Sequence, residues 1–307
     1  MFRSILNKLA LAALGLSVAA CATPPISTDA TPKTSLRVLA IETFLADIAQ
    51  NVAGTRTHVD TLIPQDVDPH EFEPTPTDVR KIADSQVLIV NGAKLEEFLD
   101  ELLANAGGKR SMIEASAGLK SRTPTANEIL DPDHPGDPHF WLDPNNVIRY
   151  VENIRDGLSQ ADPAGAAAYK ANAEAYIAQL KILNTWIVNQ VKPIPPERRL
   201  LVTNHESFGY YADRYGFKIV GTIVPSVSSG VSPSAQQLAA LVNQIKATQA
   251  PAIFLETGTN PQLAQQLAQE TGTKVVTGLC THSTTDFAPT YLKMMEYNTN
   301  AIVDALK

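Results

Sequence analysis

Two runs of alternating strand and helix signals, separated by one long helical segment, constrain the fold of this 307-residue chain more than any other feature. The first run lies within residues 36–160 and the second within residues 194–307. Short apolar strands that alternate with amphipathic helices are typical of parallel α/β sheets. The segment between them, residues 161–193, is rich in alanine and has no helix breaker after Gly165. It predicts one rigid helix of about 40 Å at 1.5 Å per residue.

The two runs resemble each other, which indicates a diverged internal duplication. The stretch TLIP…PTPTDVRKIADSQVLIVNG in the first half corresponds to TIVP…VSPSAQQLAALVNQIKATQAPAIFLETG in the second. We therefore expect an α/β fold of two lobes with parallel sheets, joined by a single long backbone helix. Ligands of such sheets collect at the carboxyl ends of the strands. This rule places a binding site in the cleft between the lobes.

The first 21 residues predict an export signal rather than a part of the fold. Arg3 and Lys8 precede an apolar run, residues 9–20, which is too short for a comfortable membrane span. The run ends in small residues followed by Cys21, as in bacterial lipoprotein signals, so we expect lipid attachment at Cys21. A plain secretory signal is the alternative. Residues 22–35, rich in Pro, Thr and Ser, predict a flexible tether to a bacterial membrane, in the periplasm or at the cell surface.

Charge and motif content argue against several classes of function. A net charge of −7, without a cluster of Arg and Lys, disfavours nucleic acid as a partner. The pairs His70-Glu71 and His205-Glu206 do not continue as H-E-x-x-H, so a zinc protease of that type is unsupported. No G-x-S-x-G, P-loop or G-x-G-x-x-G occurs in the right context. We expect a monomeric binding protein rather than an enzyme, with a surface adhesin as a further possibility.

Four of the six histidines follow a strand or lie in a turn that opens toward the expected cleft. His70 lies in the loop DVDPHEFEPTPTD, whereas the corresponding loop of the second half is shorter and has no histidine. His139 lies in DPHFWLDP, between two Asp-Pro pairs that favour turns and helix ends. His205 follows the strand RLLVTN, and His282 lies in GLCTHSTTD after another strand. Strand ends are where a site of an α/β protein belongs.

Several separated motifs resemble the zinc- and manganese-binding solute-binding lipoproteins of ABC transporters, the cluster A-I or cluster 9 group. The motifs are DVDPHEFEPTP, DPHFWLDP, NHESFGYYADRYGF and TYLKMMEYNTNAIVDAL. The resemblance covers nearly all of the mature chain and implies one divalent metal between two lobes, delivered to a membrane permease. It also implies metal-ligand roles for His70, His139 and His205. The third of these positions is histidine in zinc-type members and often glutamate in manganese-type members.

The fourth ligand position departs from the family pattern. The family usually has aspartate in a stretch similar to L-Y-T-D-S-L, whereas residues 279–283 here read LCTHS. We predict that His282 is a substitute ligand, with Asp286 as an alternative and Cys280 as a minor third candidate. The resemblance further implies that Glu256, at the end of the strand PAIFLE, orients a ligand. The alternative for Glu256 is a solvated glutamate at a strand end.

The choice of metal follows from the donor atoms. Imidazole nitrogen suits zinc, whereas manganese prefers carboxylate oxygen, so three or four histidines favour Zn²⁺ with Mn²⁺ as the alternative. Four neutral ligands leave the charge of the ion uncompensated, so nearby acidic groups should matter. Asp68 and Glu71 flank the first histidine and are expected at least to make the cleft acidic. A complete ligand set suits carrying a metal rather than activating water.

The remaining histidines are predicted to be surface residues. Zinc-type members of the family often carry a long His-rich loop before the second ligand. The corresponding region here, residues 123–137, is short and offers only His134. A metal-gathering loop is therefore at best vestigial, and His58 and His134 are assigned to the surface.

Overall fold

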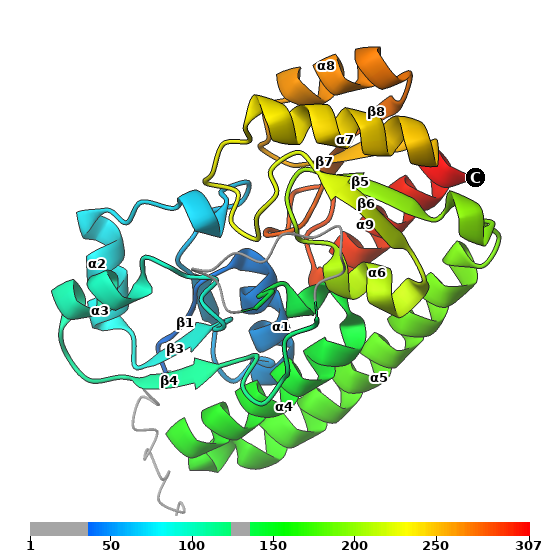
Figure 1. Ribbon diagram of the computed structural model, residues 1–307. Helices are drawn as coiled ribbons and strands as arrows, with labels where there is room; N and C mark the ends of the chain where they lie inside the picture. The colour runs from blue at the N-terminus through cyan, green and yellow to red at the C-terminus, as the bar shows by residue number, and fades with distance from the viewer. Residues whose placement is uncertain (1–35, 124–135) are drawn as a thin grey trace, which may run out of the picture. The chain divides into compact units, whose positions relative to one another are not determined.

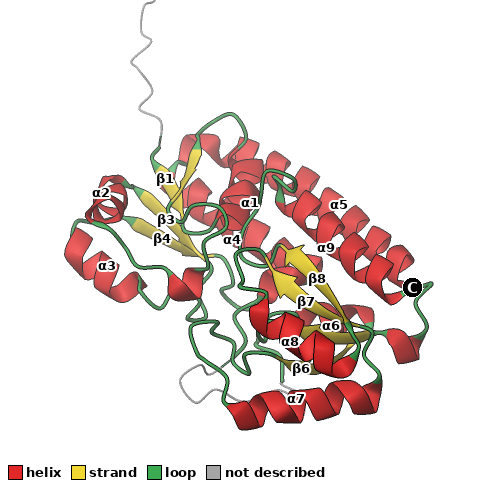
Figure 2. Cartoon of the chain, turned by 90° about the horizontal axis from the view of Figure 1, so that it is seen from above, coloured by secondary structure: helices red, strands yellow, loops and turns green. Residues whose placement is uncertain are grey.

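Two four-stranded parallel sheets form the centre of the computed structural model, which describes residues 36–123 and 136–307 (Figures 1 and 2). The strand order is β2-β1-β3-β4 in the first sheet and β6-β5-β7-β8 in the second. Every pairing within the two sheets is parallel. The α/β fold of two lobes with parallel sheets, predicted from the alternation of strands and helices, is confirmed.

The first lobe follows the predicted alternation and adds one strand. Its elements are β1 (Val38–Ala40), α1 (Thr43–Ala53), β2 (Val59–Thr61), η1 (Pro69–Glu71), α2 (Pro76–Asp84), β3 (Val87–Val90), α3 (Leu99–Ala106) and β4 (Ser111–Glu114). All four residues of β3 are buried, as expected for a central strand of a parallel sheet covered on both faces. Strand β4 was not expected from the sequence, because three of its four residues are exposed and it shows no apolar run.

The second lobe repeats the pattern of the first. Its elements are β5 (Leu200–Thr203), α6 (Gly209–Tyr215), β6 (Lys218–Thr222), α7 (Ala235–Thr248), β7 (Ala252–Glu256), α8 (Gln262–Thr271), β8 (Lys274–Leu279) and α9 (Tyr291–Leu306). Helices α2 and α7 occupy corresponding places in the two halves. Each begins with a capping box, formed by Thr75 and Asp78 in α2 and by Ser234 and Gln237 in α7.

A long helix, α5 (Ala166–Val191), runs between the two halves, as predicted. It packs against α1 of the first lobe and against α6 and α9 of the second (Figure 1). A second helix, α4 (Pro144–Ala161), lies beside it and was not expected from the sequence. A short turn that contains Pro163 separates the two helices. None of the described helices is long and apolar enough to cross a membrane.

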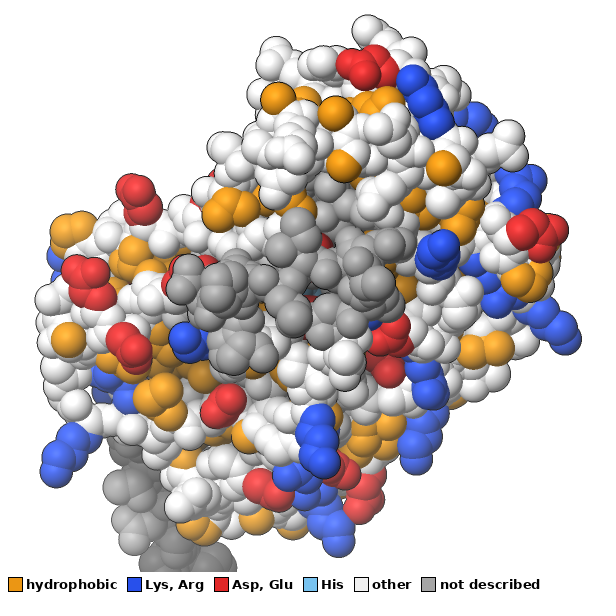
Figure 3. All heavy atoms as spheres, in the orientation of Figure 1, with side chains coloured by type: hydrophobic (Ala, Val, Ile, Leu, Met, Phe, Trp, Pro, Cys, Tyr) orange, Lys and Arg blue, Asp and Glu red, His pale blue; other side chains and the backbone are white. Residues whose placement is uncertain are grey.

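The main apolar core is continuous between the lobes. It includes residues of α1, α4, α5 and α9 together with strands of both sheets. On the face shown in Figure 3, acidic and basic side chains are interspersed rather than segregated. The two lobes therefore share their main core, and each lobe also has a smaller apolar cluster of its own.

Candidate metal centre

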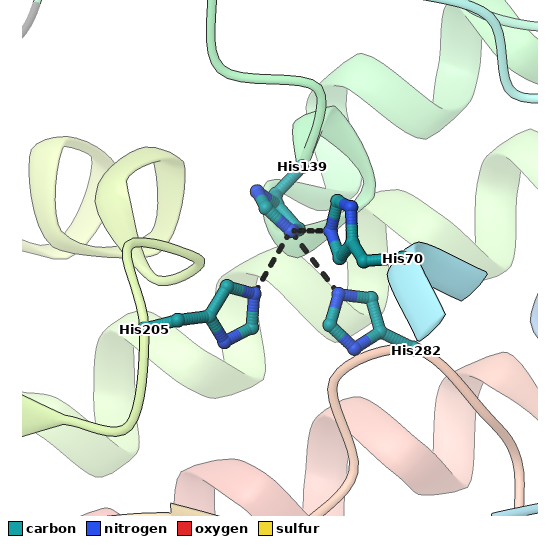
Figure 4. A group of neighbouring side chains, drawn as sticks. All are labelled: His70, His139, His205 and His282. Carbon is teal, nitrogen blue, oxygen red and sulfur yellow. Dashed lines mark hydrogen bonds between the residues drawn. The ribbon is translucent and has the colours of Figure 1, made fainter. Parts of the chain in front are cut away.

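The structure brings together the four histidines of the predicted ligand set (Figure 4). His70 lies in η1, after β2, and His139 directly precedes the short helix η2 (Phe140–Leu142). His205 lies two residues after β5, and His282 lies three residues after β8. Each lobe thus supplies two histidines, and all four lie in the segments between the long helices and the strands, with His70 in the short helix η1.

The ring nitrogens of the four histidines lie at distances that fit a tetrahedral ion. The Nε2 atom of His139 is 3.4 Å from that of His70, 3.2 Å from that of His205 and 3.1 Å from that of His282. Zn–N bonds of 2.0–2.1 Å in a tetrahedron place the nitrogens about 3.3–3.4 Å apart. In Figure 4 the ring nitrogens of His70, His205 and His282 all point toward one ring nitrogen of His139, and the four ligand atoms lie within 4.8 Å of one another.

A buried carboxylate fixes the orientation of His139. Asp137 accepts hydrogen bonds from both the backbone N–H and the Nδ1 of His139, each at 2.9 Å. The Nδ1 proton is thereby held by the carboxylate, which leaves Nε2 as the acceptor that faces the cluster. The hydroxyl of Tyr210 donates to the backbone oxygen of Asp137 at 2.8 Å, and Arg122 lies 3.9 Å from its carboxylate. The sequence reasoning missed Asp137, although its place two residues before His139 was a usable signal.

The tryptophan of DPHFWLDP connects the loops that carry His139 and His282. Trp141 stacks on Phe44 of α1, with ring centroids 4.4 Å apart. Its Nε1 donates to the backbone oxygen of Thr281 at 2.7 Å, and Tyr291 donates to the backbone oxygen of Trp141 at 2.6 Å. Because Thr281 directly precedes His282, Trp141 fixes two ligand loops relative to each other.

Glu256, the last residue of β7, lies behind His205. Its Oε1 is 2.7 Å from the Nδ1 of His205, and its Oε2 accepts a hydrogen bond from Thr281 at 2.8 Å. The side chain is 4% exposed, so it is not the solvated glutamate of the alternative. Burial acts to lower the pKa of His205, but the charge of Glu256 raises it above its usual value. Burial acts to raise the pKa of Glu256, but His205 lowers it.

Two carboxylates face the second nitrogen of His282. Its Nδ1 is 3.8 Å from Oδ2 of Asp68 and 3.7 Å from Oε2 of Glu256. Burial lowers the pKa of His282 to about 4, against the opposing effect of Asp68, so the ring is neutral near pH 7. Although burial acts to raise it, the neighbouring His282 and His70 hold the pKa of Asp68 well below its usual range. A neutral imidazole is the form that binds metal.

The other candidates for the fourth position are not part of the cluster. Asp286 is exposed, at the tip of a turn closed by the backbone pair Thr285 and Ala288. Cys280 is buried, and its Sγ lies 3.8 Å from the hydroxyl of Thr285. Burial raises the pKa of Cys280 to about 11, which keeps the thiol protonated, whereas thiolate is the form that ligates metal.

The remaining residues singled out in the sequence lie away from the cluster or outside the described residues. The side chain of His58 is 78% exposed and lies 3.3 Å from Asp60. Glu71, which directly follows His70, is exposed. Cys21 and His134 lie outside the described residues.

Comparison with known proteins identifies the family of this chain. Residues 38–305 match the family described as the periplasmic zinc-uptake complex component A. The chain belongs to this family. The resemblance that the sequence motifs indicated is therefore confirmed. The chain is also 34% identical over 274 residues to the manganese-binding lipoprotein MntA of Halalkalibacterium halodurans, an alignment that covers 88% of each chain.

Solved structures of similar proteins share the two-lobed fold. A manganese-bound mutant of a periplasmic metal-binding protein from Candidatus Liberibacter asiaticus is 28% identical and has a TM-score of 0.79, covering 88% of this chain and 99% of that one. The periplasmic zinc-binding protein TroA from Treponema pallidum is 26% identical and has a TM-score of 0.78, covering 88% and 98%. The fold of the zinc-uptake component A family thus extends over all but a small part of the chain.

Proposed function

We propose that this chain is the extracytoplasmic metal-binding component of an ABC importer, which captures one divalent transition-metal ion and delivers it to a membrane permease. The observation that supports this most is the convergence of four imidazole nitrogens from both lobes at distances typical of a tetrahedral ion. Membership of the zinc-uptake component A family supports the transport role.

The arrangement of the four histidines favours a carrier over an enzyme. Catalytic zinc sites keep one position open for water or substrate, whereas structural and carrier sites are closed by protein ligands. Four imidazoles complete a tetrahedral shell, and the side chains of His139 and His205 are fully buried. The bound ion is therefore expected to be carried rather than used to activate water.

We propose zinc as the ion, with manganese as the second candidate. Four nitrogen donors suit Zn²⁺, while the preference of Mn²⁺ is for oxygen. The second candidate has support from the similarity to a manganese-binding lipoprotein. The carboxylates of Asp137, Glu256 and Asp68 lie behind the rings and would balance the charge of either ion.

Equilibrium dialysis followed by elemental analysis tests the binding function. We expect about one zinc ion per chain, removable by a chelator, and affinity for zinc several orders of magnitude above that for manganese. Comparable affinities for the two ions would contradict the four-nitrogen site. Absence of metal binding would contradict the transport role and leave the adhesin interpretation.

The location of the protein is part of the proposal. Residues 1–21 are proposed to form the lipoprotein signal, with cleavage before Cys21 so that Cys21 carries the lipid, and residues 22–35 to act as a tether. A Cys21→Ser chain should leave the membrane fraction, and this can be followed by fractionation and immunoblotting. A variant that remains membrane-bound, with no accumulation of unprocessed chain, would contradict the lipid anchor.

A further inference from the structure

A cavity of about 530 Å³ lies against one side of the histidine cluster. Its walls include Asp68 of the first lobe and the stretch 281–283 of the second. Among the four clustered histidines, His282 lines this cavity, whereas His70, His139 and His205 do not. An ion that arrives through the cavity therefore meets Asp68 and His282 before it can reach the other three rings.

The two nitrogens of the His282 ring face two different groups of side chains. Nε2 faces the other histidines, 3.1 Å from Nε2 of His139. Nδ1 lies 3.3 Å from the hydroxyl of Thr281 and faces two carboxylates, 3.8 Å from Asp68 and 3.7 Å from Glu256. Donor atoms around a tetrahedral ion with bonds of 2.0–2.2 Å lie about 3.4 Å apart. One donor atom each of Asp68, Glu256 and His282 lie within 4.8 Å of one another, so these three side chains could surround a second ion position after a small approach.

We propose that Asp68, Glu256 and the Nδ1 atom of His282 form a second divalent-cation site, occupied in alternation with the four-histidine site. This inference rests on the proposed metal-binding function. A neutral imidazole has one nitrogen that accepts and one that carries a proton, so a single ring binds one ion at a time. When the ion moves from Nδ1 to Nε2, a proton moves from Nε2 to Nδ1 and the ring stays neutral. A carboxylate released from the ion then accepts a hydrogen bond from Nδ1–H, and the proton stays on the ring.

The donor set defines the kind of ion that this second site accepts. Two carboxylates and one imidazole suit Mn²⁺ or a partly hydrated Zn²⁺, because oxygen donors are compatible with retained water ligands. Asp68 is anchored for this role, since it accepts hydrogen bonds from the hydroxyl of Ser229 at 2.6 Å and from the backbone N–H of His70 at 2.9 Å. Since Asp68 and His282 line the cavity, the second site would hold an arriving ion before the ion reaches the other three rings.

The test removes the four-histidine site and asks what remains. His139 contacts the other three rings but does not belong to the second group, so His139→Ala disables the first site alone. Titration with MnCl₂, followed by electron paramagnetic resonance, should still show one weakly bound Mn²⁺ per chain. Adding Asp68→Asn should weaken this binding roughly 10-fold or more. Adding Glu71→Gln, which removes an exposed carboxylate of the same cavity, should leave it unchanged.

The spectrum distinguishes the second site from an indirect effect of Asp68. Electron spin echo modulation of the bound Mn²⁺ should report nitrogen coupling from one imidazole. Coupling from three imidazoles, an unchanged affinity in the Asp68→Asn background, or no residual Mn²⁺ would each overturn the proposal. If His139→Ala does not fold, as judged by circular dichroism, His70→Ala serves in its place. Zinc binding by the wild-type chain, measured in parallel, shows separately whether the proposed function itself holds.

Discussion

At the scale of single residues, His282 decides how the proposed site is completed. His282→Ala should weaken zinc binding by roughly 10- to 1000-fold, about 1.4 to 4 kcal/mol, because one of four nitrogen ligands is lost. His282→Asp would add a carboxylate and should shift the relative preference toward manganese. Chelator competition measures both effects. Asp286→Ala is the matched control and should be nearly silent, since Asp286 is exposed. A sensitive Asp286 with a tolerant His282 would contradict this assignment.

We expect Asp137→Ala to weaken metal binding almost as much as His282→Ala, although Asp137 would not contact the ion. Asp137→Ala removes the group that holds the Nδ1 proton of His139, so the ring can rotate and present the wrong nitrogen. Loss of such an outer partner typically costs 10- to 100-fold in metal affinity. Asp213→Ala is a suitable control, because Asp213 also pairs with Arg122 but its side chain is about half exposed. Equal effects of the two changes would show that Asp137 acts only through Arg122.

The sequence predicted which histidines would gather but not how each is oriented. The positions of His70, His205 and His282 in loops after strands follow from the geometry of parallel sheets, whereas His139 lies in a turn before η2. The choice between His282 and Asp286 depended on the path of one loop. The short turn at Thr285 and Ala288 sends Asp286 outward, and no local pattern announces such a turn. The role of Asp137 likewise depends on a turn that aims its carboxylate back at a ring two residues later.

At the scale of elements, helices and strands with a strong apolar pattern were predicted from the sequence, and those with a weak pattern were missed. The buried strand β3 and the capped helices α2 and α7 carry clear local signals. Strand β4 is mostly exposed, so it lacks the apolar run that marks a strand. Helix α4 begins with Pro144 and two asparagines, which read as a turn, and it contains Gly157. Its stability comes from packing against α5, which the sequence alone does not display.

Two buried carboxyl groups follow strands β1 and β3 and should make stability depend on pH. Burial raises the pKa of Glu96 to about 7, and burial together with the charge of Glu96 raises that of Glu42 well above its usual value. The folded chain therefore binds more protons than the unfolded chain between about pH 4.5 and 7. The contribution of these groups to stability is present below that window and is lost as the pH rises through it.

Replacing one of these carboxyls isolates their effect. As the pH rises from 5 to 8, the unfolding free energy of the wild type should fall relative to that of Glu42→Gln. Each unit by which folding raises the pKa of Glu42 contributes about 1.36 kcal/mol to this change. Denaturant unfolding at a series of pH values measures it. Glu71→Gln, at an exposed position, should show no such trend. A flat difference for Glu42→Gln would mean that folding does not raise the pKa of Glu42.

At the scale of the whole molecule, one ion would contact loops of both lobes and should therefore stabilise the folded unit as a whole. A ligand that binds only the folded state adds about 4 kcal/mol when its free concentration is 1,000 times the dissociation constant. For a chain of this size, that corresponds to a rise of roughly 10 °C in the midpoint of thermal unfolding. His282→Ala, if it weakens zinc 100-fold, should retain only about 1.4 kcal/mol at the same free zinc concentration. Calorimetry with buffered zinc measures both shifts. If only one lobe held the metal, zinc would instead separate the thermal unfolding into two transitions. It would raise the midpoint of only one of them, because the other lobe would unfold without releasing the ion.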